Sequence, residues 1–408
     1  MNRKVKINLI VLFVLINVDL SASGWGWTKI QRLINGKRSE ASGFSINGKG
    51  YVCCGLDSND VCYKDLWEYD PVLNVWTQKA NVPGSIRRAA FAFELNNMGY
   101  VGGGIDNEIK SLGTLLSDFH MYNPTTNSWT TKSTLPFALF RSASATYNNK
   151  AFVFCGANSW AGTSNVYQYD PLTDSWSNVS YFFGPPTSTG GREGGVATTI
   201  NNKIYFGMGK DDVWYQKDWW EFDPITYSWT RKADFPASGR TGAFAFTLNN
   251  TAIVGMGSDG IYNNDTWQYN NITNSWAYVA SFSGDGRRNP AYFVIGNVGF
   301  MGSGNSGTGN KQDFFRLDAD VSSTEINTPV TFFTYYNPAE KELHISLKEN
   351  NEESFSIALL NLEGKIILKQ NIESSDFVIN TTNLSSGIYL ATIINNNQFI
   401  STKKILIN

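Results

Sequence analysis

Arginine recurs along this chain at intervals of about 50 residues, in a pattern that could bind anions. The repeated residues are Arg38, Arg88, Arg141, Arg192, Arg240 and Arg288. A guanidinium group is permanently charged and planar, so it binds a carboxylate through two parallel hydrogen bonds. Arg192 is followed by Glu193, whose carboxylate could act as an acid or a base. A ring of such arginines would favour an acidic or polyhydroxylated ligand.

Aromatic residues close to these arginines could add a stacking surface for a sugar. They are Trp160, Trp214, Tyr215 and Tyr262. A second interpretation needs no ligand: the arginines pair with nearby aspartates, and the rings cover their own loops. Both interpretations stay open at the level of the sequence.

Other kinds of chemistry find little support in the composition. The chain has only two histidines, His120 and His344, which argues against a histidine triad or a multi-histidine metal site. We therefore expect no metal and no cofactor. Cys53, Cys54, Cys62 and Cys155 are interpreted as small buried side chains, although a bridge from Cys62 to Cys53 or Cys54 would suit an oxidising compartment. The formal net charge of −2 gives no indication of nucleic-acid binding.

The arginines belong to a larger repeat. Tryptophan returns with the same period, at Trp27, Trp76, Trp129, Trp176, Trp229 and Trp276. Each tryptophan except the first follows an Asx-rich turn such as 70–75, and each turn follows an aromatic segment of alternating pattern such as 65–70. Further upstream, an apolar run closes on glycine, as in 51–55. Each unit therefore predicts four short antiparallel strands.

Four sub-motifs that recur in order resemble the kelch repeat, and the resemblance covers residues 24–320. It implies an all-β fold, a six-bladed kelch-type β-propeller. The sixth unit stops at Asp318 without its tryptophan, whereas Trp27 has no unit before it. We therefore expect the N-terminal strand to complete the last blade. Galactose oxidase shares kelch units but needs two histidines at its copper, and the propeller has only His120.

In such blades the arginines would begin the innermost strands and surround one mouth of the central channel. The loops between the second and third strands would lie on the same face, and they contain Trp160, Trp214, Tyr215 and Tyr262. This face is the predicted ligand site.

The ends of the chain predict export. Residues 1–23 combine a cationic start, a short apolar run and Ser21-Ala22-Ser23, which is typical of a signal peptide cleaved before Gly24. We expect no transmembrane segment in the mature chain. Residues 321–330 are interpreted as a linker, and 331–408 as a small β-sandwich. This last segment resembles the C-terminal sorting domain of the type IX secretion system of Bacteroidota, on Asn337-Pro338, 361–365, 384–389 and the Lys-Ile-Leu-Ile tail. The resemblance implies the secretion machinery as a partner and a secreted or cell-surface location.

Three functions remain open from the sequence. The first is non-enzymatic binding of a glycan or protein outside the cell. The alternative is a carbohydrate-active enzyme similar to the six-bladed kelch N-acetylneuraminate mutarotases, with Arg192 and Glu193 as the acid–base pair. The third is protein scaffolding on the same face.

Overall fold

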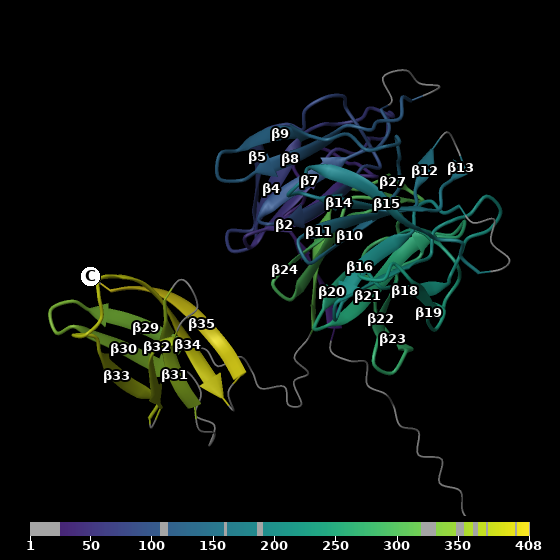
Figure 1. The fold of residues 1–408 in the computed structure, drawn as a ribbon. Coiled ribbons are helices and arrows are strands. Elements are labelled where there is room, and N and C mark those ends of the chain that lie inside the picture. Colours follow the sequence, from purple (N-terminus) through teal and green to yellow (C-terminus); the bar gives the residue numbers. More distant parts are fainter. Residues whose placement is uncertain are drawn as a thin grey trace, which may run out of the picture. The chain divides into compact units, whose positions relative to one another are not determined.

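A computed structural model describes residues 25–106, 113–158, 161–185, 191–319, 332–347, 355–361, 366–372, 374–395 and 398–407. The predicted signal peptide 1–23 and linker 321–330 lie outside these residues. The chain divides into two compact units, residues 1–322 and 323–408 (Figure 1).

The first unit contains six four-stranded antiparallel sheets, which form the blades of a propeller. Five blades are continuous in sequence. Blade 1 has β2 (Ser42–Ile46), β3 (Lys49–Cys53), β4 (Leu66–Asp70) and β5 (Val75–Lys79). Blade 2 has β6 (Phe91–Leu95), β7 (Met98–Gly102), β8 (Phe119–Asn123) and β9 (Ser128–Lys132). Blade 3 has β10 (Ala143–Tyr147), β11 (Lys150–Phe154), β14 (Asn165–Asp170) and β15 (Ser175–Tyr181).

The remaining blades follow the same plan. Blade 4 has β16 (Val196–Ile200), β17 (Lys203–Gly207), β18 (Trp219–Phe222) and β19 (Trp229–Arg231). Blade 5 has β20 (Thr241–Leu248), β21 (Thr251–Ser258), β22 (Asp265–Asn270) and β23 (Ser275–Ser281). Blade 6 has β24 (Ala291–Ile295), β25 (Val298–Gly302), β28 (Phe314–Ala319) and β1 (Trp25–Ile30). Short hairpins lie in the loops of blades 3 and 6: β12 (Ala157–Asn158) with β13 (Ala161–Gly162), and β26 (Asn305–Ser306) with β27 (Gly309–Asn310).

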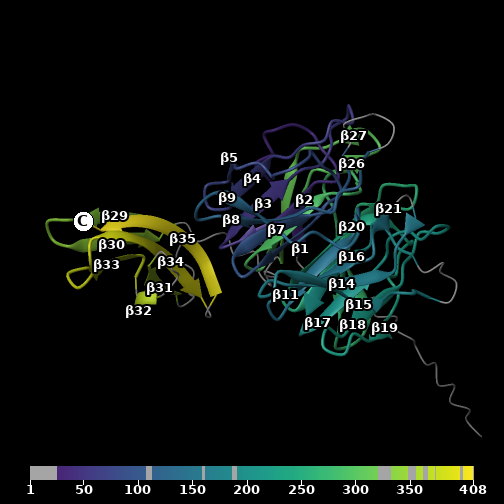
Figure 2. The same ribbon diagram turned by 45° about the horizontal axis from the view of Figure 1, so that its top comes forward.

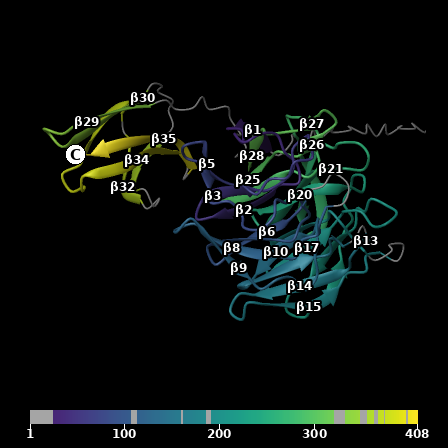
Figure 3. The same ribbon diagram turned by 90° about the horizontal axis from the view of Figure 1, so that it is seen from above.

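Strand β1 closes the ring, as the sequence predicted (Figure 3). Trp27 lies opposite Leu317, in the register that places Trp129 opposite Tyr122 in blade 2. The indole of Trp27 donates to Thr266 Oγ1 of blade 5 at 3.2 Å. Closure by an N-terminal strand gives blade 6 the fourth strand that its own sequence lacks.

Residues of all six first strands line the central channel. Figure 2 shows three of these strands, β2, β16 and β20, in the interior of the propeller. In β2, Phe44 and Ile46 are buried while Gly43 and Ser45 are partly exposed, as expected for a strand with one face between blades and the other on the channel. Gly50 on the neighbouring strand has no side chain because a Cβ there would lie 2.1 Å from the ring of Phe293 in blade 6. Aromatic rings therefore wedge the blades together, and glycine makes room for them.

Hydroxyl groups on the channel strands tie adjacent blades. Ser42 Oγ donates to the carbonyl of Ala90 at 2.7 Å, and Thr199 Oγ1 donates to that of Thr146 at 2.8 Å. These bonds satisfy polar groups along the inner strands without a salt bridge.

The second unit is a small sandwich of two antiparallel sheets, in the orders β29-β30-β33 and β32-β31-β34-β35. Its core includes Leu343, Ile357, Leu359 and Ile393. The first sheet contains β29 (Phe332–Asn337), β30 (Glu342–Leu347) and β33 (Asp376–Asn380). The second contains β32 (Ile366–Asn371), β31 (Phe355–Leu360), β34 (Gly387–Asn395) and β35 (Gln398–Ile407). Across the described residues, no helix has the length and apolar character that a membrane span requires.

Candidate functional site at the channel mouth

A buried arginine–aspartate pair fixes the entry of the first strand in five blades. In blade 1, Arg38 Nη1 donates to Asp65 Oδ1 at 2.6 Å and Nη2 donates to Oδ2 at 2.9 Å, and Arg38 is 0% exposed. Its Nη1 also donates to the carbonyl of Cys54, 16 residues later. The same two-pronged pairing joins Arg87 to Asp118, Arg192 to Asp218, Arg240 to Asp265 and Arg287 to Asp313. We call these five the framework arginines.

Blade 3 lacks this pair because Leu139 and Asn165 occupy the two positions. The backbone shows the equivalence: Gly104 N–H donates to the carbonyl of Leu139 at 2.7 Å, just as Gly55 N–H donates to that of Arg87 at 2.9 Å. Both members of the ion pair are replaced together, so neither charge is left buried and alone.

The sequence-predicted arginines therefore do not occupy six equivalent positions, which corrects that expectation. Arg38, Arg192 and Arg240 are framework arginines and are buried against aspartates. Arg88 and Arg288 come one residue after the framework position, and Arg141 comes two residues after Leu139. The periodicity could not resolve the difference, because Arg87-Arg88 and Arg287-Arg288 are adjacent pairs.

A closed ring of backbone hydrogen bonds surrounds the mouth of the channel. Each blade contributes one residue with φ between +53° and +66°, just before its first strand or, in blade 5, at the second residue of that strand. Its N–H donates to the carbonyl of the equivalent residue in the preceding blade, over 2.7–3.1 Å. We call these residues the mouth ring; they are Glu40, Ala89, Arg141, Gly194, Gly242 and Asn289.

One half of the mouth ring is filled by an ion-pair network. Glu40 accepts from Arg141 Nη2 at 2.7 Å and Nε at 3.1 Å, and it also pairs with Arg88. Arg141 Nη1 reaches Glu193 Oε2 at 3.3 Å, and Asn289 Nδ2 donates to Glu40 at 3.3 Å. Glu40 thus holds two guanidinium groups from two other blades.

The charge state of Glu40 follows from these contacts. Burial alone would raise its pKa, but the attraction of Arg141 and Arg88 and their hydrogen bonds outweigh burial and lower the pKa to about 2. The carboxylate is therefore ionised at physiological pH, and the same contact raises the pKa of Arg141.

The sector of the mouth ring at blades 4 and 5 has no such network; we call it the open sector. Gly194 and Gly242 carry no side chains, and a Cβ on either would lie 2.2 Å from Thr241 Oγ1 or Asn289 Oδ1 respectively. The channel below has a volume of about 430 Å³, and its lining includes Glu40, Arg141 and both glycines. The channel therefore has room for a small ligand, with Thr241 Oγ1 and Asn289 Oδ1 close to the two glycines.

Arg288 comes directly before the mouth-ring residue Asn289 and is equivalent to Arg88, which pairs with the mouth-ring residue of the preceding blade; for Arg288 that residue is Gly242. Its guanidinium carbon lies 5.9 Å from the ring centre of Tyr262, and its buried Nε has no hydrogen-bond partner. Among the described residues, no carboxylate forms an ion pair with Arg288, whereas Arg88 and Arg141 share Glu40. Tyr262 itself donates to Asn305 Oδ1 at 2.8 Å. Next to the mouth ring, Arg288 is therefore a guanidinium group that the described residues leave without a carboxylate partner.

Arg192 and Glu193 do not form a pair with each other. Arg192 is 0% exposed and bonds Asp218, whereas the carboxylate of Glu193 points to Arg141. Of these two residues, only Glu193, with a partly exposed side chain, could reach a ligand. Its charge partner is the mouth-ring arginine of blade 3.

The predicted loop aromatics lie on the same face as the mouth. Backbone bridges join Glu193 to Lys210 and Lys210 to Tyr215, and Lys210 Nζ lies 5.8 Å from the Tyr215 ring centre. Trp214 is 67% exposed. Trp160 lies outside the described residues.

The histidines and cysteines add no reactive centre to this site. His120 is buried and bonds Asp118 at 2.8 Å, which places it in the framework of blade 2. All four cysteines are buried thiols. Burial raises the pKa of Cys155 to about 12, so its thiol stays protonated.

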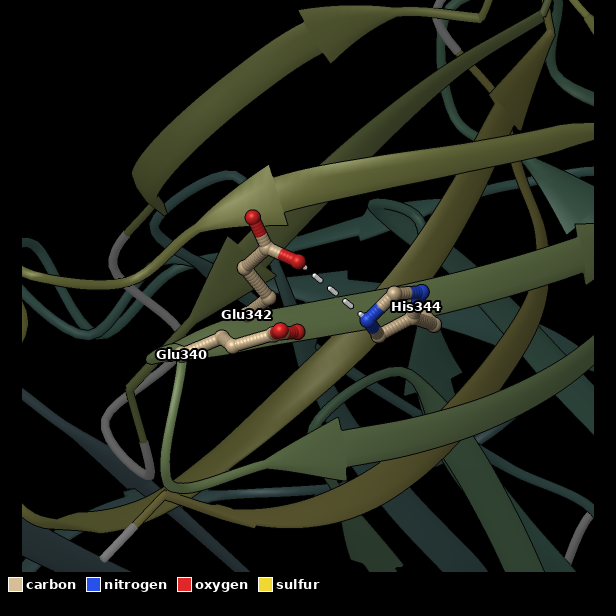
Figure 4. A group of neighbouring side chains, drawn as sticks. All are labelled: Glu340, Glu342 and His344. Atoms are coloured by element: carbon tan, nitrogen blue, oxygen red, sulfur yellow. Dashed lines mark ion pairs between the residues drawn. The ribbon is translucent and has the colours of Figure 1, made fainter.

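A second cluster of charged side chains lies in the sandwich unit. Glu342 and His344 share one face of β30, and Glu340 precedes that strand (Figure 4). Their ligand atoms lie within 4.8 Å of one another, and His344 Nε2 is 3.4 Å from Glu342 Oε2. The three groups are partly or fully exposed, and their arrangement is explained by the ion pair.

Comparison with known proteins defines both units. A model of the kelch motif matches residues 138–182, and a model of the secretion system C-terminal sorting domain matches residues 334–408. The solved structure of YjhT, a kelch propeller, superposes with a TM-score of 0.60 at 20% identity, over 70% of this chain and 95% of that one. The chain is thus a kelch-type propeller protein with a C-terminal sorting domain, and that domain indicates export to the cell surface or the medium.

Sequence relatives match parts of the propeller. Kelch-like protein 25 of Xenopus tropicalis is 30% identical over 206 residues, which is 49% of this chain and 33% of that protein. N-acetylneuraminate epimerase of Escherichia coli O9:H4 is 29% identical over 162 residues, and that of Shigella flexneri serotype 5b is 28% identical over 162 residues. Each epimerase match covers 40% of this chain and 39% of the epimerase. The matched segments therefore span only a third to two fifths of these relatives.

Sequence reasoning missed two residues of the mouth, Glu40 and Asn289. Both occupy the mouth-ring position, which carries a different residue in nearly every blade, so no repeat marks it. A usable signal existed in the spacing of 16 residues that separates each framework arginine from the carbonyl it bonds. Counting from those carbonyls identifies Leu139 as the sixth framework position.

Proposed function

We propose that this protein is an exported propeller that binds an acidic glycan at the channel mouth. Arg88 and Arg141 pair there with the carboxylates of Glu40 and Glu193, and Arg288 stands next to the mouth-ring residue Asn289. One positive charge is left over, and it favours an anionic ligand. The observation that carries the proposal is Arg288, which has no carboxylate partner among the described residues.

The shape of the mouth supports a small polar ligand rather than a protein side chain. The open sector offers Asn289 and Thr241 as hydrogen-bonding groups beside the glycines. Pockets of several hundred Å³ with a few convergent polar groups typically hold small molecules. A ligand carboxylate would pair with Arg288, and ligand hydroxyl groups would form hydrogen bonds with Asn289.

The proposed function requires that the propeller leave the cell. Residues 1–23 would direct the chain through the periplasm as a signal peptide, and residues 331–408 would engage the type IX secretion machinery. The propeller would then meet glycans outside the cell.

A glycan array tests the proposal. Purified wild-type protein should bind acidic glycans in preference to their neutral counterparts. Arg288→Gln should weaken that binding about ten- to a hundredfold, because a charge-assisted contact is worth roughly 1.5–3 kcal/mol. Arg231→Gln is the matched control: its guanidinium also lies 5.9 Å from an aromatic ring, that of Trp220, but on the outermost strand of blade 4. Acidic-glycan binding that survives Arg288→Gln would place the site elsewhere.

An epimerase is the second candidate function. It is supported by the likeness to N-acetylneuraminate epimerases and by Glu193, a carboxylate beside Arg141. Glu193 would be the group that moves the proton. Anomer exchange followed by NMR should then exceed the uncatalysed rate with wild type and return to it with Glu193→Gln. If exchange stays at the uncatalysed rate with wild type, the binding function stands alone.

A further inference from the structure

The backbone of Trp214 is held by several hydrogen bonds, although its side chain is exposed to solvent. Asp211 Oδ1 accepts from the backbone N–H groups of Val213 at 2.9 Å and Trp214 at 2.6 Å, and Asp211 N–H donates to the carbonyl of Trp214 at 3.1 Å. Gln216 Nε2 donates to the other carboxylate oxygen at 2.7 Å. Asp211 is only 3% exposed. An exposed aromatic ring on an ordered loop offers contact area at a low cost in backbone entropy.

The loop that carries Trp214 is joined to the mouth. Glu193 and Lys210 exchange two backbone hydrogen bonds, each of 2.9 Å. Lys210 in turn lies over Tyr215, which is next to Trp214. A ligand that leaves the mouth past Glu193 would therefore reach Lys210 and Tyr215 and then the indole of Trp214.

The adjacent blade continues this surface. Tyr262 in blade 5 is bridged to Ser258 as Tyr215 is bridged to Lys210, so Ile261 occupies the position of Trp214. Ile261 is 73% exposed, and its N–H is held by Asp259 Oδ1 at 3.0 Å. The segment around Gly239 lies between the two loops: a Cβ there would be 2.3 Å from the carbonyl of Tyr215.

The composition of this surface favours a carbohydrate over a protein partner. The exposed apolar side chains of Val213 and Ile261 accompany Trp214, but Lys210, Asp212 and Gln216 alternate with them along the loops. Flat rings beside charged and amide groups suit sugar units, which have an apolar face and a polar edge.

We propose that the ligand is a linear acidic oligosaccharide or polysaccharide, whose terminal unit enters the mouth while the next units lie over Tyr215 and Trp214. This inference rests on the proposed glycan-binding function and extends it to the ligand's length. The mouth would select for charge, and the Trp214 surface would select for chain length.

Calorimetric titrations with ligands of increasing length test the proposal. The probes are galacturonate with its linear oligomers, and N-acetylneuraminate with its α2,8-linked oligomers. In the series that binds, wild type should bind oligomers about tenfold more tightly than the monosaccharide. Trp214→Ala should abolish that gain and leave monosaccharide affinity unchanged. Tyr278→Ala, which removes an exposed ring from outer strand β23, is the control and should keep the gain.

The outcomes separate the two proposals. Equal affinity for monosaccharide and oligomers, or a length gain that survives Trp214→Ala, overturns the extended site and leaves the acidic mouth intact. Absence of binding in both series overturns the proposed function together with this inference. Loss of monosaccharide affinity in Trp214→Ala would show that the indole belongs to the mouth itself, and this too overturns a separate outer site.

Discussion

Glu40 of blade 1 reaches across the channel mouth to Arg141 of blade 3, with 2.7 Å between Oε1 and Nη2 and 101 residues between them in the chain. The intervening blade contributes Arg88 to the same carboxylate. One buried acid thus joins three blades at the point where their backbones already form a ring. It also balances the positive charge of Arg88 and Arg141 in blades 2 and 3, whereas Arg288 of blade 6 has no carboxylate partner among the described residues.

Replacing Glu40 should destabilise the propeller in a pH-dependent way. The folded-state pKa is lowered from 4.5 to about 2, so the ionised form is favoured by folding. Its contribution, roughly 3 kcal/mol, is fully present above pH 4.5 and is lost as the pH falls towards 2. Denaturant unfolding should show Glu40→Gln well below wild type at pH 7, with the difference shrinking in acid.

Glu94→Gln is the matched control for that experiment. Glu94 also lines the channel, but the contact recorded for its carboxylate is the N–H of Asn97 at 2.6 Å. Its substitution should cost little at either pH. A Glu40→Gln deficit that is the same at pH 7 and in acid would contradict the ion-pair explanation.

The coupled replacement in blade 3 predicts a double-mutant cycle in blade 4. Arg192→Leu alone leaves Asp218, which is 2% exposed, without its counter-charge and should cost about 3–5 kcal/mol. Adding Asp218→Asn recreates the Leu139–Asn165 combination and should recover part of that loss, measured by denaturant unfolding. If the stability losses of Arg192→Leu and Asp218→Asn simply add in the double variant, the ion pair does not explain why both positions are replaced together in blade 3.

Closure by the N-terminal strand predicts that Trp27 matters as much as a tryptophan inside a continuous blade. Trp27→Ala and Trp129→Ala should each lower the free energy of unfolding by about 3–5 kcal/mol. Both indoles donate a hydrogen bond to another blade, to Thr266 and Ala80 respectively. A melting temperature unchanged by Trp27→Ala alone would mean that β1 contributes little to closing the ring.

Export should depend on the second unit. Deleting residues 331–408 removes the sorting domain but none of the six blades. We expect the truncated propeller to accumulate folded in the periplasm, as cell fractionation with limited proteolysis would show, while the full chain reaches the surface or the medium. Normal delivery of the truncated chain would contradict the role assigned to this domain.

The sequence predicted the blades well because each repeat contains the same packing residues, which have equivalent neighbours in all six blades. The tryptophan of the fourth strand recurs in every blade, and the glycine at or just after the end of the second strand meets equivalent neighbours each time, so selection for packing leaves a period. Trp27 could even be assigned to blade 6, because its partner motif at Asp318 lacked a tryptophan.

The mouth was harder to predict because it depends on where the blades differ. Glu40, Arg141 and Gly194 hold the same backbone position with unrelated side chains, and only the closed ring of hydrogen bonds shows that they are neighbours. The arginines that recur with this period are of two kinds: some are buried against aspartates, and others lie beside the mouth ring or in it. A one-residue offset decides between them, and an interval of about 50 residues cannot resolve it.

A crystal structure with an acidic glycan selected on the array would test the central claim most directly. The account predicts electron density over Gly194 and Gly242, with a ligand carboxylate within hydrogen-bonding distance of Arg288 and hydroxyl groups facing Asn289. Density confined to the opposite face of the propeller, or a ligand whose carboxylate contacts none of Arg88, Arg141 and Arg288, would contradict it.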